Sequence, residues 1–115
     1  MKKKIFLITN QGLHPVEKKL KKTFGDDIVV KQITKGNLPY SLKYGSVIAK
    51  EVRNWIFEIE DGDIYIVWSG LGIYNSIVYQ VIYQTLSKRP IFVLFNKETD
   101  SYEEWDIDPR KLIFN

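Results

Sequence analysis

The sequence predicts one Rossmann-like α/β domain over residues 1–115, a three-layer fold whose mainly parallel central sheet carries an antiparallel extension at the C-terminal end. Short apolar runs alternate with longer segments of helical periodicity, a pattern typical of parallel sheets covered by helices. The run Ile64 to Trp68 also leads through Ser69–Gly72 straight into a helical segment. A 44% hydrophobic content over 115 residues is enough for a single core and argues against disorder.

The first half of the chain is expected to supply two strands and two helices. Lys4–Thr9 contains four successive apolar residues and predicts a buried strand. Pro15 suits the first turn of a helix that runs to Phe24, with its apolar residues at i, i+4 and i+8 and Gly25 as its C-cap. A second strand, an irregular segment and a second helix are expected over Ile28–Ile33, 34–45 and Ser46–Ile59.

The second half is dominated by the segment Ile73–Leu86, which is predicted to be a helix with apolar residues on nearly every side. Such a helix is buried all round, and one sheet face cannot cover it, so the sequence predicts a homodimer that buries part of helix 73–86. A strand is expected at Ile91–Phe95. The C-terminal extension is expected to comprise an antiparallel strand, a break and a short edge strand, at Tyr102–Ile107, Pro109 and Leu112–Phe114.

Composition excludes several classes of protein. The chain has no cysteine and one histidine, so disulfides, thiolate zinc sites and histidine-rich metal sites are excluded, and no cofactor is expected. No apolar run reaches the roughly 20 residues that span a bilayer. Lys2–Lys4 precedes an apolar run too short for a signal peptide, so a cytoplasmic protein without membrane contact is expected. The basic N-terminal part could attract an anionic ligand, or it could be a solvated lysine surface.

Two polar loops are expected to meet at the carboxyl edge of the sheet. One is Asn10–His14 after the first strand, and the other is Ser69–Gly72 after the third. Right-handed crossovers put these two strands side by side, and ligands of open α/β sheets bind where such loops converge. Backbone N–H groups at the start of the following helix favour phosphate. The predicted ligand-binding residues are Asn10, Gln11, Gly70, Leu71, Gly72, Asn75, Ser76 and Lys97.

The residues that could carry chemistry each have a structural alternative. His14, the only histidine, could be a general acid or base, or a residue without a role before a helix. Ser69 could be a nucleophile, or it could bind ligand through its hydroxyl. The glycines of Ser69–Gly72 could cradle a phosphate or serve only a tight turn. Trp68 could pack in the core or stack on a base. The set is rich in donors and poor in carboxylates, which favours an anionic, phosphate-bearing ligand.

Several stretches together resemble small proteins associated with type III CRISPR systems. They are the opening Lys4–Pro15, the pair Gly62-Asp63, the loop Ser69-Gly70-Leu71-Gly72, and Arg89-Pro90-Ile91. The group consists of single-domain CARF-like proteins, some of which are ring nucleases. The resemblance implies a homodimer that binds a cyclic oligoadenylate second messenger, most often the tetra-adenylate, and that either cuts it or only binds it. The implied cleavage needs no metal: a ribose 2′-hydroxyl attacks the adjacent phosphate and leaves a 2′,3′-cyclic phosphate, with His14 and Ser69 as the candidate catalytic residues.

Three functions therefore remain open from the sequence. The first is a metal-independent phosphodiesterase, a ring nuclease of antiviral defence that acts on cyclic oligoadenylate. The second is a module of the same fold that senses or sequesters a nucleotide without cutting it. The third is a small α/β interaction subunit. Duplex nucleic acid is not an expected partner in any of them.

Overall fold

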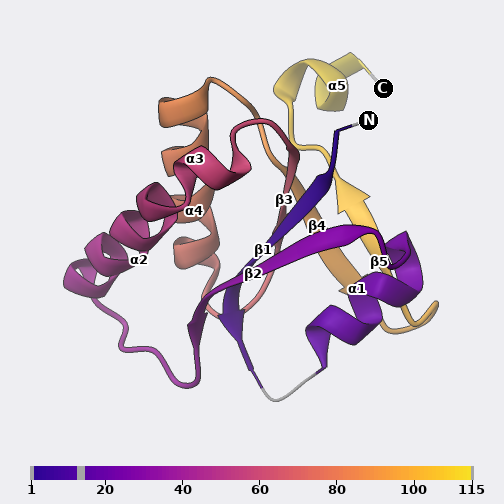
Figure 1. Cartoon of the computed structure of the whole chain (residues 1–115), viewed down its shortest axis with the longest axis horizontal. Helices are drawn as coiled ribbons and strands as arrows, with labels where there is room; N and C mark the ends of the chain where they lie inside the picture. The colour runs from indigo at the N-terminus through magenta and orange to yellow at the C-terminus, as the bar shows by residue number, and fades with distance from the viewer. Residues whose placement is uncertain (1, 13–14, 115) are drawn as a thin grey trace.

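The computed structural model is built on a five-stranded sheet in the order β2-β1-β3-β4-β5 (Figure 1). The structure describes residues 2–12 and 15–114. Neighbouring strands are parallel except for the last pair, which is antiparallel. The predicted α/β class, the mainly parallel sheet, the adjacent first and third strands and the antiparallel extension are confirmed. The strands are β1 (Lys4–Gln11), β2 (Ile28–Lys35), β3 (Asp63–Val67), β4 (Ile91–Asn96) and β5 (Ser101–Trp105).

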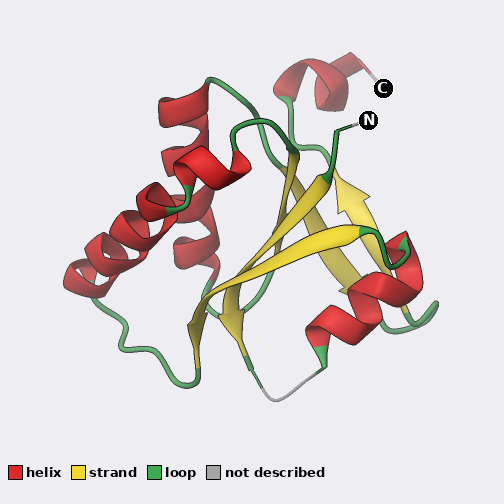
Figure 2. Cartoon of the chain, in the orientation of Figure 1, coloured by secondary structure: helices red, strands yellow, loops and turns green. Residues whose placement is uncertain are grey.

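Helices cover both faces of this sheet. Figure 2 shows α1 on one side and α2, α3 and α4 together on the other. Strand alternation sorts the core accordingly: Ile5 and Leu7 belong to the cluster beneath α2 and α4, whereas Phe6 and Ile8 belong to the cluster beneath α1. The helices are α1 (Val16–Phe24), α2 (Leu42–Asn54), α3 (Ile56–Ile59), α4 (Gly72–Leu86) and α5 (Pro109–Phe114). No helix in the described part of the chain has the length and hydropathy required to cross a membrane.

The second helix begins earlier than the sequence predicts and is interrupted. Ser41 caps α2 because its Oγ accepts the N–H of Tyr44 at 3.1 Å. Gly45, expected to lie in an irregular segment, is part of α2, and its missing side chain lets α2 approach α4 closely, because a Cβ there would meet Ile77 at 2.8 Å. At Trp55 the backbone leaves the helical region, which separates α2 from the single turn α3.

The predicted edge strand at Leu112–Phe114 is wrong, because α5 occupies this stretch. Asp108 accepts the backbone N–H of Arg110 at 3.0 Å, and Pro109 occupies the first helical position. A proline there loses no hydrogen bond, since the first N–H groups of a helix have no partner inside it. Pro109 therefore starts a helix, whereas the sequence predicts only that it ends the preceding strand.

The apolar circumference of α4 is covered largely within the chain. The sheet buries one side, where Val78 and Ile82 are fully inaccessible, and α2 crosses the other side closely at Gly45. The side that remains exposed is uncharged and runs along Ile73, Ser76 and Gln80. A second subunit is therefore not needed to bury most of α4, although Ile73 is still 53% exposed.

Candidate functional site

A pocket of about 530 Å³ opens at the carboxyl ends of β1, β3 and β4, on the face that carries α1. The chain runs from β1 to one side of the sheet through β2, and from β3 to the other side through β4. Ligands of open α/β sheets bind outside the strand ends at such a reversal of strand order. Residues that bear on the chemistry of this carboxyl-edge pocket are Asn10, Lys19, Ser69, Phe95, Lys97 and Asp100.

Three predicted site residues, Asn10, Ser69 and Lys97, line the carboxyl-edge pocket. Asn10 and Ser69 come together across the β1–β3 junction, where the backbone N–H of Asn10 donates to the Ser69 Oγ at 3.0 Å. That hydroxyl in turn donates to the carbonyl of Val67 at 3.0 Å. The Asn10 side chain donates to the Gly36 carbonyl at 2.9 Å and thereby ties β1 to the loop after β2.

Asn75 holds the loop after β3 in shape. Its side chain is completely buried, and its amide donates to the carbonyls of Ser69 and Leu71 at 3.0 and 3.2 Å. Its Oδ1 accepts the Ser69 N–H at 3.3 Å. These three hydrogen bonds engage the amide on both its donor and its acceptor side. Ser76 is exposed on α4, where its hydroxyl donates to the Gly72 carbonyl one turn earlier.

Gly70 and Gly72 of this loop are each required for a different steric reason. Gly70 has a φ of +65°, and a Cβ there would lie 3.0 Å from the Asn10 Cβ. Gly72 begins α4, and a Cβ there would lie 3.0 Å from the Trp68 indole. That indole packs edge-on against Phe92, with 5.3 Å between ring centroids. Among the described residues, nothing accepts the N–H groups of Gly72 and Ile73, which are therefore open at the start of α4.

Two lysines give the carboxyl-edge pocket its positive charge. Lys19 of α1 lies over the Phe95 ring, with its ammonium 4.2 Å from the centroid, and 3.9 Å from a carboxylate oxygen of Asp100. Asp100 also binds Lys22 at 2.6 Å, and this hydrogen-bonded ion pair lowers the pKa of the Asp100 carboxyl. Lys97 is exposed and has no ion pair within the described residues. The lining of the pocket therefore carries two ammonium groups and one carboxylate.

Sequence reasoning missed Lys19, Phe95 and Asp100 as parts of this pocket. The two interpretations of the basic N-terminal part, an anion-attracting or a solvated surface, do not single out Lys19, yet it follows the inward-facing Val16 by three residues and so borders the buried side of α1. Asp100 has a φ of +52°, the left-handed conformation that aspartate tolerates in tight turns. The antiparallel β4–β5 connection thereby brings Asp100 back to α1, a contact that the separate elements do not indicate.

The remaining predicted residues lie around the carboxyl-edge pocket. Gln11 ends β1 and accepts the Gly36 N–H through its carbonyl at 3.0 Å. Leu71 precedes α4 and is 38% exposed. His14 lies outside the described residues. Within 2–12 and 15–114, no three of the His, Cys, Asp and Glu side chains are grouped so that they could hold a metal ion.

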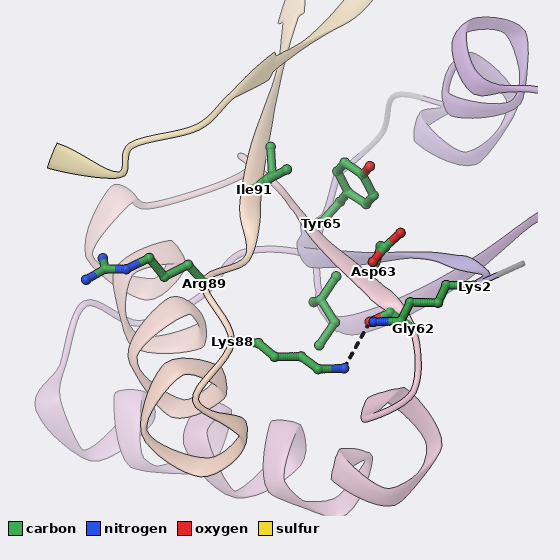
Figure 3. A pocket seen from close by; sticks show the side chains of 8 residues that line it. Lys2, Gly62, Asp63, Tyr65, Lys88, Arg89 and Ile91 are labelled. Atoms are coloured by element: carbon green, nitrogen blue, oxygen red, sulfur yellow. Dashed lines mark hydrogen bonds between the residues drawn. The ribbon is translucent and has the colours of Figure 1, made fainter. Parts of the chain in front are cut away.

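A second cavity, of about 470 Å³, lies at the opposite, amino edge of the sheet (Figure 3). The Lys88 ammonium reaches across it to the backbone carbonyls of Gly62, at 3.3 Å, and Glu60. Arg89 points away from Lys2 and Lys88 in this view. Burial and the nearby carboxylate of Glu104 raise the pKa of Tyr65 to about 12, so its phenol stays protonated. Lys88 is thus engaged by the protein's own carbonyls, whereas Lys97 at the carboxyl edge makes no ion pair within the described residues.

No protein-family model, curated protein or solved structure matches the chain significantly.

Proposed function

We propose that the carboxyl-edge pocket binds a phosphate-bearing nucleotide. The observation that carries the proposal is the meeting of Lys19 and Lys97 with the ends of β1 and β3 at the reversal of strand order. Ammonium groups attract phosphate, and the neighbouring Phe95 and Tyr102 give an apolar wall against which a base or ribose packs. The open N–H groups at the start of α4 add a favourable potential next to the pocket.

At the finer level we propose a Rossmann-like, CARF-like domain whose ligand is a cyclic oligoadenylate, with the tetra-adenylate as the first ligand to test. The support is the resemblance of the sequence to small type III CRISPR-associated proteins, together with a pocket of the charge that such a ligand requires. Ring cleavage by the ribose 2′-hydroxyl would require the protein to hold the attacking oxygen in line with the phosphate and to stabilise charge. Lys19 and Lys97 are suited to the second task.

A non-catalytic module that sequesters the same ligand is the second candidate, and the state of Ser69 favours it. The Ser69 hydroxyl donates its proton to the Val67 carbonyl, so a nucleophilic role would require this hydrogen bond to break and the proton to pass to a base. An activated serine needs a base within hydrogen-bond reach. No described side chain takes that place, and His14 remains the proposed general acid or base.

We also propose that the protein is a two-fold dimer through the exposed side of α4. This side carries Ile73, Ser76 and Gln80 and is continuous with Tyr40 and Leu42, which are 80% and 88% exposed and share a groove with Ile73. Uncharged surface with large apolar residues is typical of interface cores. Light scattering that finds a monomer at micromolar concentration would contradict this dimer.

The decisive experiment mixes the purified protein with cyclic oligoadenylates in EDTA, with binding measured by calorimetry and products resolved by chromatography. Binding with a 2′,3′-cyclic phosphate product supports the ring nuclease, and binding without product supports sequestration. Lys97→Ala should weaken binding about 3–10-fold if its ammonium meets a phosphate. Lys50→Ala on α2, also exposed and without an ion pair, is the matched control. No heat of binding with any cyclic or linear adenylate would overturn the nucleotide proposal.

A further inference from the structure

The sheet carries an exposed aromatic surface that adjoins the carboxyl-edge pocket at Trp68 and extends from there to β5 on the face that carries α4. Trp68 directly follows β3 and is 43% exposed, and Trp105 ends β5 and is 51% exposed. Phe92 pairs with Trp105, and Leu94 pairs with Glu103, across the antiparallel strands. Directly paired residues share one face of a sheet. We call Trp68, Phe92, Leu94, Glu103 and Trp105 the aromatic shelf, which the helices on this face leave open at both tryptophans.

The Trp68 indole packs against neighbouring rings on one side, and part of it stays accessible to solvent. Trp68 packs edge-on against Phe92, and Phe92 stacks on Tyr79 of α4 at 5.4 Å between centroids. Gly72 leaves the room that the Trp68 ring occupies. Two strand spacings across the sheet and two residues along the strand separate Trp68 from Trp105, which sets their backbones roughly 12 Å apart. The contacts that hold the Trp68 ring allow it to receive a flat ligand without a large entropic cost.

Cationic side chains flank the shelf at both ends of β4. Arg89 precedes the strand and its guanidinium stacks over the Tyr83 ring at 4.7 Å, pointing away from Lys2 and Lys88 (Figure 3). Lys97 follows the strand. Neither makes an ion pair within the described residues, since the nearby Asp108 carboxylate binds Arg110 at 2.8 Å. Arg89 also donates to the hydroxyls of Tyr79 and Tyr83 at 3.5 and 3.4 Å, so the two cations beside the rings have neutral partners or none and keep their charge for phosphates.

Glu103 gives the shelf a hydrogen-bond acceptor. Its Oε1 accepts the Asn96 amide at 2.7 Å, and a carboxylate has capacity for about three further hydrogen bonds. Glu103 shares a row with Leu94 and lies two residues from Trp105 on the same strand face. A carboxylate accepts from the exocyclic amines of cytosine and adenine, whereas the carbonyl of uracil repels it. The same charge disfavours a phosphate directly above it, so the backbone of a ligand would run along the flanking cations.

We propose that the aromatic shelf binds single-stranded nucleic acid by stacking bases on Trp68 and Trp105, with a preference for adenine and cytosine that Glu103 sets. Stacking on aromatic side chains with cations along the strand is the usual chemistry of single-strand binding. Duplexes are excluded because their bases keep their faces covered by one another. The shelf shares Trp68 and Lys97 with the carboxyl-edge pocket, whereas Glu103 and Trp105 do not line that pocket, so variants of these two residues test the shelf by itself.

The test is a fluorescence titration with ten-nucleotide oligo(A), oligo(C), oligo(U) and a duplex, at low salt. The wild-type protein is expected to bind oligo(A) and oligo(C) with quenching of tryptophan emission, and to bind oligo(U) and the duplex at least 5-fold more weakly. Trp105→Leu should weaken binding about 5–100-fold, the range found when one base loses an aromatic partner. Trp55→Phe is the matched control, because Trp55 lies at the end of α2 and its loss should change the signal but not the affinity.

Two further variants test the roles of the charges. Glu103→Gln should bring the affinities for oligo(A) and oligo(U) together, since an amide both donates and accepts. Arg89→Gln should reduce the slope of log affinity against log salt by about 0.7, the value for one phosphate of a single strand. Lys18→Gln on the opposite side of the molecule should change neither quantity beyond experimental error.

Three results would overturn the proposal. The first is no binding of any oligonucleotide by the wild-type protein at low salt. The second is unchanged affinity in Trp105→Leu with loss of affinity in Lys18→Gln, which would assign binding to the lysines of α1. The third is a change of oligomeric state in Trp105→Leu without any change in oligonucleotide binding, which would assign the shelf to a second copy of the chain.

Discussion

The two sides of the carboxyl-edge pocket use their polar residues in opposite ways. On the β3 side, Ser69 and Asn75 direct their hydrogen bonds to neighbouring backbone, and the loop after β3 keeps its own shape. On the α1 and β5 side, Lys19 and Lys97 place ammonium groups at the mouth of the pocket. The comparison teaches that a polar residue at a ligand-binding edge is not thereby available to a ligand, because irregular backbone needs partners first.

The largest expected effect comes from removing the residue that holds the loop. Asn75→Leu should destabilise the protein by about 2–4 kcal/mol, since three hydrogen bonds are lost and buried backbone groups are left without partners. Urea unfolding followed by circular dichroism measures this loss. Ser76→Ala, one residue later on the exposed side of α4, should change stability by less than about 0.5 kcal/mol. A loss of ligand binding in Asn75→Leu at unchanged stability would instead show that the amide contacts the ligand.

Gly70 offers a smaller effect on the same side. Gly70→Ala forces a side chain into the left-handed region and against Asn10, with an expected cost of about 1–2 kcal/mol. Gly12→Ala is the control, because a Cβ there meets no atom within 4 Å and the substitution should be nearly neutral. Equal stability of the two variants in urea would show that the loop relaxes freely, contrary to the rigid frame described here.

On the other side of the pocket, Asp100 competes with any anion for the lysines. Asp100→Asn removes the ion pairs with Lys19 and Lys22, so binding of an anionic nucleotide should strengthen by roughly 2–5-fold at low salt, the scale of exposed ion pairs. Calorimetry in low and high salt measures the change, which should shrink as screening increases. Weaker binding in Asp100→Asn would mean that Asp100 positions the lysines for the ligand and does not block them.

Much of the fold could be predicted from the sequence because its signals are local. The apolar runs of β1, β3 and β4 and the periodic stripe of α1 each mark one element, and their alternation predicts the parallel sheet. The sequence predicts an irregular segment across Ser41 and Gly45, so the start of α2 is missed. Ser41 caps this helix, and Gly45 lets it approach α4 closely. Interhelical packing overrides the low helix propensity of glycine.

The site could be predicted only in outline. The edge of the sheet follows from the strand order, and Asn10, Ser69 and Lys97 do lie at the pocket there. Which polar groups remain open depends on hydrogen bonds between residues far apart in sequence, such as that from Asn10 to Ser69. The parts contributed by Lys19 and Asp100 depend on the return of β5 toward α1, where the Tyr102 N–H donates to the Thr23 hydroxyl at 3.2 Å. No local pattern carries that information.

The smallest expected effect concerns Asp108, a carboxylate that, like Asn75, serves the backbone. Its pKa is lowered to about 2, chiefly by hydrogen bonds from the side chain and the backbone N–H of Arg110. Since the folded pKa lies below the ordinary value of about 4, the ionised carboxylate stabilises the start of α5 fully above pH 4. That contribution declines as the pH falls from about 4 and is lost below about pH 2. An NMR titration of the side-chain carboxyl carbons should give Asp108 a midpoint near 2, and Arg110→Gln should raise it toward the ordinary value. An unchanged midpoint in Arg110→Gln would mean that another group holds the carboxylate, and that α5 does not depend on this cap.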